Sequence, residues 1–283
     1  MKAPPFAYQR AQSMAAACAL LAQHTGNARI LAGGQSLIPT LNLRLSQPEL
    51  LIDISQLTEL RGIRVSDQQM VIGALTRHAD IEKSTDVRRV FPALANAASH
   101  IAHPAIRNRG TMGGSIALAD PAAEWPAASL AFDMSFTLVS TRGERVVKAD
   151  EFFKGLYETV LAPDEILKSI HIPLPAAGSQ TAFGELTRRS GDYAIAGAFV
   201  NTCKSGGKLS NPRIAFFGVS GQPMLARGAM AALEGTAADA AAVAGAQACL
   251  EKDLDPIADL YHARATKLHL SRVLLARLVA QLG

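Results

Sequence analysis

The spacing of apolar residues predicts a chain that mixes helices with short strands. Residues 13–23 have the spacing of an amphipathic helix, with Met14, Cys18 and Leu21 on one face, and residues 263–282 repeat the pattern with leucines at regular intervals. Apolar or alternating runs too short for helices predict strands over residues 28–31, 50–54, 62–65, 70–75, 135–140, 144–147, 166–172, 183–188, 196–204 and 208–219. Further helices are expected over residues 38–45, 79–83, 90–102, 149–153, 224–233 and 237–250, with Thr76 as the N-cap before 79–83.

The order of these elements predicts an α+β fold in three parts. Alternation of strands and helices in residues 1–56 indicates a small parallel α/β subdomain. Residues 57–175 are expected to form a second subdomain, an antiparallel sheet with helices. A Pro-Ala-Ala-Gly-Ser linker at residues 175–179 leads into residues 176–283, where we expect a C-terminal α+β domain with a three-stranded antiparallel sheet and helices.

Two glycine pairs interrupt this pattern and carry the candidate chemistry. One lies in Ala32-Gly33-Gly34-Gln35-Ser36-Leu37, after the apolar run at 28–31, and the other in Arg109-Gly110-Thr111-Met112-Gly113-Gly114-Ser115. Glycine lets a ligand approach the backbone closely, and successive N–H groups in such a turn form a nest for anions. Neither stretch has the spacing of a dinucleotide-binding Rossmann unit or of a P-loop. Either pair alone is also compatible with an ordinary turn, whereas two such nests suit a ligand with two phosphates.

Composition and charge mainly exclude classes of protein, namely nucleic-acid-binding and membrane-spanning proteins. Apolar residues make up 49% of the 283 residues and charged residues 18%, which is typical of a globular protein with a substantial core. The net charge of +4 comes from scattered Lys and Arg, a pattern that does not favour nucleic-acid binding. No apolar run is long enough to cross a membrane, and the N-terminus lacks the apolar core of a signal peptide.

The cysteines and histidines give no sign of a metal centre in this chain. Cys18, Cys203 and Cys249 lie far apart without a C-x-x-C spacing, which excludes a zinc site or an iron–sulfur cluster built from neighbouring cysteines. His100 and His103 have no third ligand signalled nearby, so no metal site is predicted. Isolated, reduced thiols favour a cytoplasmic location.

Taken together, the two glycine loops resemble those of a known family. The first, followed by Asn42, Arg44 and the run at 51–54, is similar to the first FAD loop of the FAD-binding medium subunits of molybdenum hydroxylases. These include the medium subunit of carbon monoxide dehydrogenase and, more distantly, the central FAD domain of xanthine dehydrogenase. The second, followed by residues 120–124 (Asp-Pro-Ala-Ala-Glu), resembles the second FAD loop. Further matches at residues 164–167, 170–173 and 188–194 extend the resemblance essentially from Phe6 to Leu282.

This resemblance implies a two-subdomain FAD-binding fold and an electron-transfer function. In such complexes a large subunit oxidises the substrate at a molybdopterin cofactor, and a small subunit with [2Fe–2S] clusters relays electrons. The medium subunit's FAD passes them to an external acceptor such as NAD, a quinone or oxygen. The resemblance therefore implies FAD in this chain, partner small and large subunits, and a dimer of heterotrimers.

The resemblance also implies which residues contact FAD. These are Ala32, Gly33, Gly34, Gln35, Ser36, Leu37, Thr111, Gly113, Gly114, Ser115, Asp120, Glu124, Leu167 and Tyr193. Tyr193 would lie near the isoalloxazine ring and control access of oxidants, although a core tyrosine is the alternative. Asp120 and Glu124 would accept hydrogen bonds from FAD hydroxyls, although Asp120 also suits an Asx turn before Pro121.

One departure from the family concerns a positive charge beside the flavin. Some members carry a lysine where this chain has Gly184 or Glu185, so Arg188 or Arg189 is the expected substitute. Two other functions stay open from the sequence alone. One is a self-contained FAD-dependent oxidoreductase with its own substrate site, and the other is a nucleotide-binding assembly protein without redox turnover.

Overall fold

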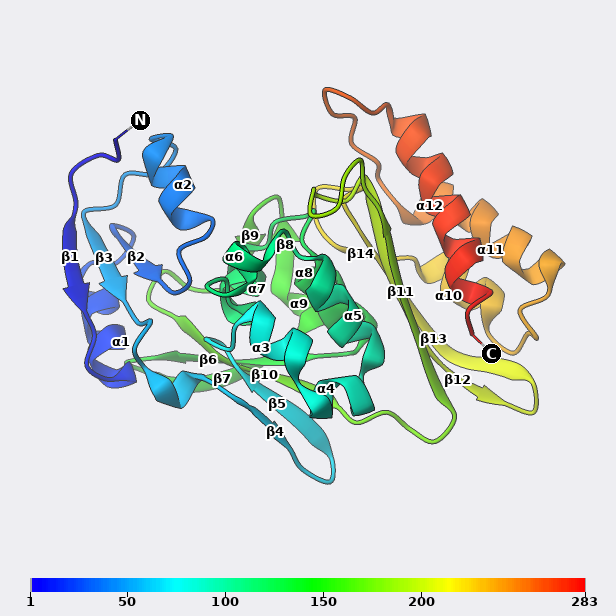
Figure 1. Ribbon diagram of the computed structural model, residues 1–283, viewed down its shortest axis with the longest axis horizontal. Helices are drawn as coiled ribbons and strands as arrows, with labels where there is room; N and C mark the ends of the chain where they lie inside the picture. Colours follow the sequence, from blue (N-terminus) through cyan, green and yellow to red (C-terminus); the bar gives the residue numbers. More distant parts are fainter. Residues whose placement is uncertain (1, 283) are drawn as a thin grey trace.

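Three larger β-sheets follow one another along the long axis of the molecule in the computed structural model, which describes residues 2–282 (Figure 1). The first sheet has three parallel strands in the order β1-β3-β2. Its elements, with two helices between strands, are β1 (Ala7–Arg10), α1 (Met14–Gln23), β2 (Ala28–Leu31), α2 (Leu37–Asn42) and β3 (Leu50–Asp53). The Ser13 hydroxyl accepts a hydrogen bond from the Ala16 amide (3.1 Å) and so caps α1. The parallel α/β unit expected at the N-terminus is therefore present, with β1 as an added edge strand.

The second sheet is antiparallel and has five strands in the order β4-β5-β10-β6-β7. They are β4 (Ile63–Val65), β5 (Gln69–Gly73), β6 (Ser135–Ser140), β7 (Gly143–Lys148) and β10 (Ile166–Pro173). Short helices connect them: α3 (His78–Lys83), α4 (Thr85–Val90), α5 (Pro92–His100), α6 (Pro104–Arg107), α7 (Met112–Leu118), α8 (Glu124–Ala131) and α9 (Ala149–Phe152). A small hairpin, β8 (Phe153–Gly155) with β9 (Glu158–Thr159), completes this part.

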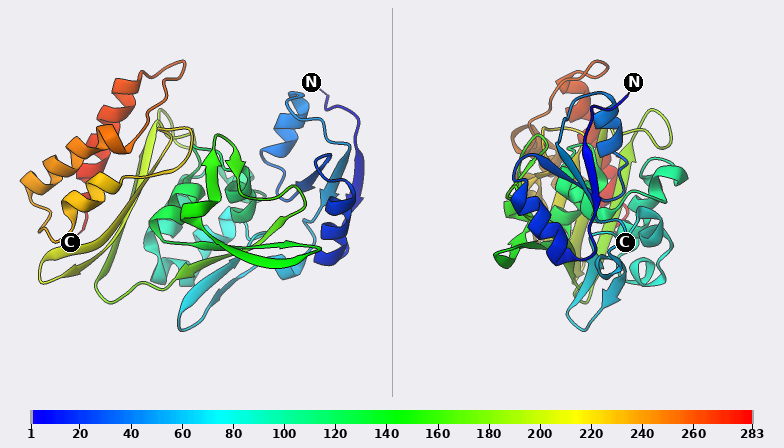
Figure 2. Two further views of the ribbon diagram at one scale, coloured as in Figure 1. Left: turned by 180° about the vertical axis from the view of Figure 1, so that it is seen from behind. Right: turned by 90° about the vertical axis from the view of Figure 1, so that its left-hand side faces the viewer.

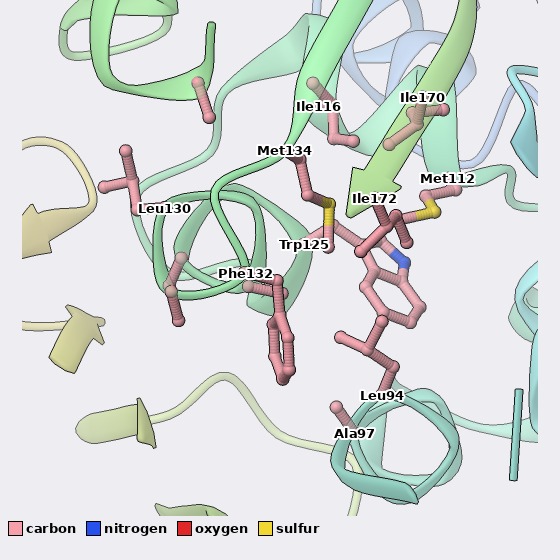
Figure 3. Close-up of a cluster of buried hydrophobic side chains, with 14 of the residues drawn as sticks. Leu94, Ala97, Met112, Ile116, Trp125, Leu130, Phe132, Met134, Ile170 and Ile172 are labelled. Atoms are coloured by element: carbon pink, nitrogen blue, oxygen red, sulfur yellow. The ribbon is translucent and has the colours of Figure 1, made fainter. Parts of the chain in front are cut away.

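The core of the second part is built around Trp125, whose side chain is fully buried. Figure 3 shows its indole ring between Leu94 of α5 and the side chains of Met112 and Ile172. The same cluster of buried residues includes Phe183, Phe199 and Phe217 of the C-terminal sheet. The two parts thus share one hydrophobic core.

The C-terminal sheet stands between two sets of helices. Its strands are β11 (Ser179–Leu186), β12 (Ala196–Ser205), β13 (Lys208–Phe217) and the short β14 (Met224–Leu225), all antiparallel neighbours. One face packs against α5 and α8 of the second part. The outer face carries α10 (Arg227–Leu233) and α12 (Arg264–Val279), with α11 (Ala240–Asp253) packed on both, as seen from behind in Figure 2. No helix within residues 2–282 combines the length and the apolar character needed to cross a bilayer.

The structure corrects three details of the sequence-based elements. Thr76 does not cap α3, because its hydroxyl bonds to the backbone of Gly62 instead and the N-cap position is Arg77. The C-terminal sheet has a fourth strand, β14, at the start of what was expected to be one helix over 224–233. The linker ends earlier than expected, since Ser179 already pairs with Cys203 in the sheet.

Candidate cofactor-binding site

The first glycine loop connects β2 to α2 and presents a row of free backbone donors. Among residues 2–282, no protein acceptor receives a hydrogen bond from the amides of residues 33–37. Gly34 has φ +72°, a conformation that favours glycine, and the Gln35 side-chain amide donates to the Gly33 carbonyl oxygen (2.9 Å). The Ser36 hydroxyl at the N-cap position makes no capping hydrogen bond. Unpaired N–H groups side by side at a helix start can bind an anion, which is the role predicted for this loop.

The second glycine loop differs from the expected nest, because its amides already have protein partners. The Met112 amide donates to the Thr76 carbonyl oxygen (3.0 Å) and the Gly113 amide to that of Ala74 (2.9 Å). The Gly114 amide donates to the hydroxyl oxygen of Thr111 (3.1 Å), which is the N-cap of α7. The amides of this pair therefore have protein partners in the structure, unlike those of the first loop, and their contact with a ligand stays a prediction. The hydroxyl groups of Thr111 and Ser115 are what this loop can still offer to a ligand.

Both glycine pairs are required by protein packing. A Cβ on Gly33 would lie 2.2 Å from the backbone oxygen of Arg109 in the second loop. A Cβ on Gly113 would lie 2.5 Å from the Cβ of Ala74. A larger side chain at Gly33 would therefore disturb the packing of the two loops as well as any ligand, because the loops are in direct contact there.

Two adjoining cavities lie where the loops meet. The first, of about 510 Å³, is lined by the first loop and by Asp53, Ser55 and Arg109. The second cavity has a volume of about 410 Å³ and shares Ala32, Gly33, Ser55 and Arg109 with the first. The remaining residues that line it are Gln56, Arg61, Leu75, Arg77, Asn108 and Thr111. An anionic ligand that spans both cavities would meet the free amides of the first loop and the arginines of the second cavity.

Asp53 is a candidate contact that the sequence-based site omitted. It ends β3 and is 5% exposed, with hydrogen bonds from the Tyr8 hydroxyl (2.5 Å) and the Ser55 amide (2.7 Å). Burial opposes ionisation of this carboxyl, but these hydrogen bonds outweigh it and lower the pKa of Asp53. The carboxyl ends of parallel strands are a common place for ligands, and that rule could have identified Asp53 from the sequence. For Arg61 and Arg77 the sequence offers no comparable signal.

A third group of residues lies apart from the cavities and includes Asp120 and Tyr193. Asp120 accepts a hydrogen bond from the Ala122 amide (2.9 Å), which is the Asx turn considered above. Tyr193 is 68% exposed as a residue, so it is not a core tyrosine. Desolvation of its hydroxyl and the nearby charge of Asp120 raise the pKa of Tyr193 to about 12, and burial and Asp120 also raise the pKa of Tyr157. Asp120 thus lies close to two tyrosine hydroxyls.

Glu124 begins α8 in this same group, and its carboxyl resists ionisation. Burial, then the charges of Glu185 and Asp120, raise its pKa to about 8. Glu185 contacts the Nδ1 atom of His100 (3.2 Å) through one oxygen, and its other oxygen is buried without a partner in residues 2–282. A protonated Glu124 can donate a hydrogen bond as well as accept one, so it can bind both acceptor and donor atoms of a ligand.

The raised pKa of Glu124 predicts a pH-dependent stability. The folded chain holds the proton up to about pH 8, whereas the unfolded chain loses it near pH 4.5, so the contribution is full below pH 4.5 and lost as the pH rises through 8. Urea unfolding between pH 6 and pH 9 should show wild-type stability falling more steeply than that of Glu124→Gln. Glu59→Gln, an exposed glutamate, is the matched control. Parallel pH profiles for wild type and Glu124→Gln would contradict a neutral Glu124.

Two other expected contacts lie outside this group. Leu167 is 4% exposed within β10 and packs in the core, and neither cavity includes it. Arg188 lies over the ring of Tyr261 (4.6 Å to its centroid) and 3.9 Å from Asp192, so its guanidinium already has an aromatic and an acidic neighbour.

Comparison with known proteins places these features in a family. Residues 4–175 match the FAD binding domain in molybdopterin dehydrogenase, and residues 181–282 match the CO dehydrogenase flavoprotein C-terminal domain. The chain is 39% identical to the 6-hydroxypseudooxynicotine dehydrogenase complex subunit alpha of Paenarthrobacter nicotinovorans, over 99% of this chain and 95% of the relative. It is 42% identical to the carbon monoxide dehydrogenase medium chain of Hydrogenophaga pseudoflava, over 91% of this chain and 90% of the relative. A solved structure of the carbon monoxide dehydrogenase from Hydrogenophaga pseudoflava, in a form lacking the Mo-pyranopterin moiety, superposes with a TM-score of 0.96 at 41% identity, covering 99% of this chain and 98% of the other.

Proposed function

The chain belongs to the family of FAD-binding medium subunits of molybdenum hydroxylases, and from this premise we propose how its residues hold the cofactor and serve electron transfer. It is the FAD-carrying subunit of an oxidoreductase complex, with the iron–sulfur clusters and the molybdopterin cofactor in partner subunits. Bound FAD supplies the step from one-electron donors to a two-electron acceptor. The observation that carries the proposal is the row of free amides in residues 33–37 beside two joined cavities.

The residues present fit a dinucleotide with two phosphates. The amides of residues 33–37 and the Ser36 hydroxyl would bind phosphate oxygens, and Thr111 would add its hydroxyl from the second loop. Asp53 would accept a hydrogen bond from a ribose hydroxyl, because its carboxylate lines the same cavity. These assignments keep the first loop and Thr111 of the sequence-based site, and they add Asp53.

The group at the start of α8 would serve the redox end of the cofactor. Asp120 and Glu124 would bind polar atoms of the flavin or its ribityl chain, with Glu124 as a donor in its neutral form. The exposed ring of Tyr193 would cover the isoalloxazine and control how an acceptor reaches it. Gly113, Gly114, Ser115 and Leu167 stay predictions of the resemblance. So does the division of the chain at residues 56 and 175.

The wider setting follows from the same premise. We expect a dimer of heterotrimers, with the substrate bound in the large subunit. The named relatives differ in what they oxidise, so this chain does not determine the substrate. Cys18, Cys203 and Cys249 are all free thiols, which supports a cytoplasmic location.

Reconstitution tests the function directly. The isolated chain should bind stoichiometric FAD noncovalently and FMN more weakly, but should not be reduced by carbon monoxide, aldehydes or N-heterocycles. Addition of the iron–sulfur and molybdenum subunits should restore reduction of the flavin by the substrate of the complex, followed by stopped-flow absorbance. Tyr193→Ala should then change reoxidation by the acceptor more than substrate oxidation.

The outcomes separate the three functions. Reduction of the flavin by substrate in the isolated chain, at the rate of the complex, would indicate a self-contained oxidoreductase. A purified chain that takes up no flavin would favour the nucleotide-binding assembly protein.

A further inference from the structure

One lysine of α12 is buried beside the C-terminal sheet. Lys267 lies near the start of this helix and is only 7% exposed. A charged side chain is rarely buried unless protein groups satisfy it. The Nζ atom of Lys267 has two such partners, the carbonyl oxygen of Gly218 (3.1 Å) and the Oδ2 atom of Asp259 (3.1 Å). Lys267 therefore connects the residue that follows β13 to the loop that precedes α12.

Asp259 holds that loop in one conformation. Its Oδ1 atom accepts a hydrogen bond from the backbone amide of Tyr261 (2.8 Å). This bond, and after it the bond from Lys267, outweigh burial and lower the pKa of Asp259, so the carboxyl is ionised at neutral pH. The guanidinium of Arg188 lies over the Tyr261 ring, 4.6 Å from its centroid. The loop before α12 thus contacts the segment that leads to Tyr193.

Gly218 contacts both segments that carry Asp120 and Tyr193. Its amide donates a hydrogen bond to the carbonyl oxygen of Pro121 (2.8 Å), the residue after Asp120. A Cβ on Gly218 would lie 2.4 Å from the carbonyl oxygen of Ala194, the residue after Tyr193. The φ of Gly218 is +76°, so glycine suits this position for its backbone conformation as well as for the close approach. One backbone residue therefore sets the spacing of the two segments.

The position of the Tyr193 ring depends on this backbone support. The residue is 68% exposed, and an exposed ring has few packing contacts that hold it in place. Its hydroxyl lies near Asp120, whose own carboxylate is fixed by the Asx turn to the Ala122 amide (2.9 Å). Loss of the bond from Lys267 to the Gly218 carbonyl oxygen would release the residue that holds both segments.

We propose that Lys267 is a positioning residue, which fixes the Tyr193 ring relative to Asp120 through Gly218 and through the loop held by Asp259. The inference rests on the proposed function, in which Tyr193 covers the isoalloxazine and controls the access of an acceptor. Lys267 lies in α12 on the outer face of the C-terminal sheet and acts only through the backbone.

The FAD-free full-length chain, labelled with 3-fluorotyrosine, gives a direct measurement. The chain has four tyrosines, and Tyr193→Phe identifies which ¹⁹F resonance belongs to Tyr193. Lys267→Met removes both hydrogen bonds, whereas Asp259→Asn removes the ion pair and keeps an oxygen for the loop amides. In both variants the pKa of the Tyr193 phenol should fall, since burial and Asp120 raise it to about 12. Lys267→Arg keeps the charge and should stay close to wild type, and the Tyr8 resonance should not move.

Flavin reoxidation in the FAD-loaded complex is the second measurement. Lys267→Met should speed reoxidation by the acceptor by roughly twofold to thirtyfold, the range for changes that act through intervening residues. Tyr193→Ala should act in the same direction, and reduction by substrate should be unchanged in both. Arg272→Gln is the matched control, because it removes an ion pair with Glu251 (3.2 Å) from the same helix. It should match wild type in both measurements.

Thermal unfolding would establish that each variant is folded, and Asp259→Asn serves if Lys267→Met is not. Wild-type values of the Tyr193 pKa and of the reoxidation rate in the folded variants would show that Lys267 only stabilises α12, and the proposal would fail. If Tyr193→Ala leaves reoxidation unchanged while Lys267→Met still lowers the Tyr193 pKa, Lys267 does position the ring. The role of Tyr193 in the proposed function would then be the part that fails.

Discussion

Replacement of Gly33 by alanine should destabilise the chain and abolish retention of FAD. The added Cβ would lie 2.2 Å from the backbone oxygen of Arg109, and a backbone atom cannot move aside as a flexible side chain can. The two glycine loops would have to separate, and we expect a loss of about 3 kcal/mol in the free energy of unfolding. Urea unfolding of the FAD-free chain measures this loss, and absorbance of the purified protein measures its flavin content.

Gly245→Ala is the control for this change. Gly245 lies in α11, and a Cβ there would meet no atom within 4 Å. Alanine also favours helix, so this variant should be as stable as wild type or more stable. Wild-type stability and full flavin content in Gly33→Ala would show that the two loops do not pack as the structure has them.

Acidification should destabilise the chain through His78. This side chain is 5% exposed, and burial, then the nearby charge of Arg107, lowers its pKa to about 4. Its Nδ1 accepts a hydrogen bond from the Trp125 indole N–H (3.0 Å), so the proton gained in acid has to displace that donor. The unfolded histidine titrates near pH 6.5, so the contribution is full above that pH and lost as the pH falls toward 4. Between pH 7 and pH 5 the loss should be about 2 kcal/mol.

The variant His78→Gln isolates this effect, because glutamine stays neutral over the whole range. The free energy of unfolding of wild type should fall more steeply from pH 7 to pH 5 than that of His78→Gln. His269→Gln, at an exposed position on α12, should keep the wild-type slope. FAD should also dissociate more readily at pH 5, since the amide of His78 bonds to the Gly110 carbonyl oxygen beside the second loop (3.0 Å). Equal slopes for wild type and His78→Gln would rule out a buried neutral histidine.

The sequence predicted the fold class and the family, and both are confirmed. Apolar spacing was sufficient for elements such as β3, all of whose residues are buried, and α12, which buries Leu274, Leu275 and Leu278. It was not sufficient for β14, because that strand has only two residues and depends on pairing with β13. Local propensity also predicted Thr76 as the N-cap of α3. In the structure its hydroxyl instead forms hydrogen bonds with the backbone of Gly62, which is distant in sequence.

The candidate site shows the same limit. A glycine pair reveals that side chains are excluded but not which neighbour excludes them. For Gly33 that neighbour is Arg109, and for Gly113 it is Ala74. Arg61 and Arg77 meet in one cavity only because the segments after β3 and β5 come together in space. No spacing in the sequence records that meeting.

The shared core has a consequence for how this protein can be divided. Phe183, Phe199 and Phe217 belong to the C-terminal strands, yet they pack in the cluster around Trp125. A cut in the linker at residues 175–178 would separate two stretches of sequence without separating two bodies, because each fragment would expose the aromatic face that the other covers. The linker therefore separates two segments of the sequence, but the two segments do not fold as independent domains. A rearrangement that exchanged the C-terminal segment with that of a relative would succeed only if the aromatic residues on both sides were exchanged together.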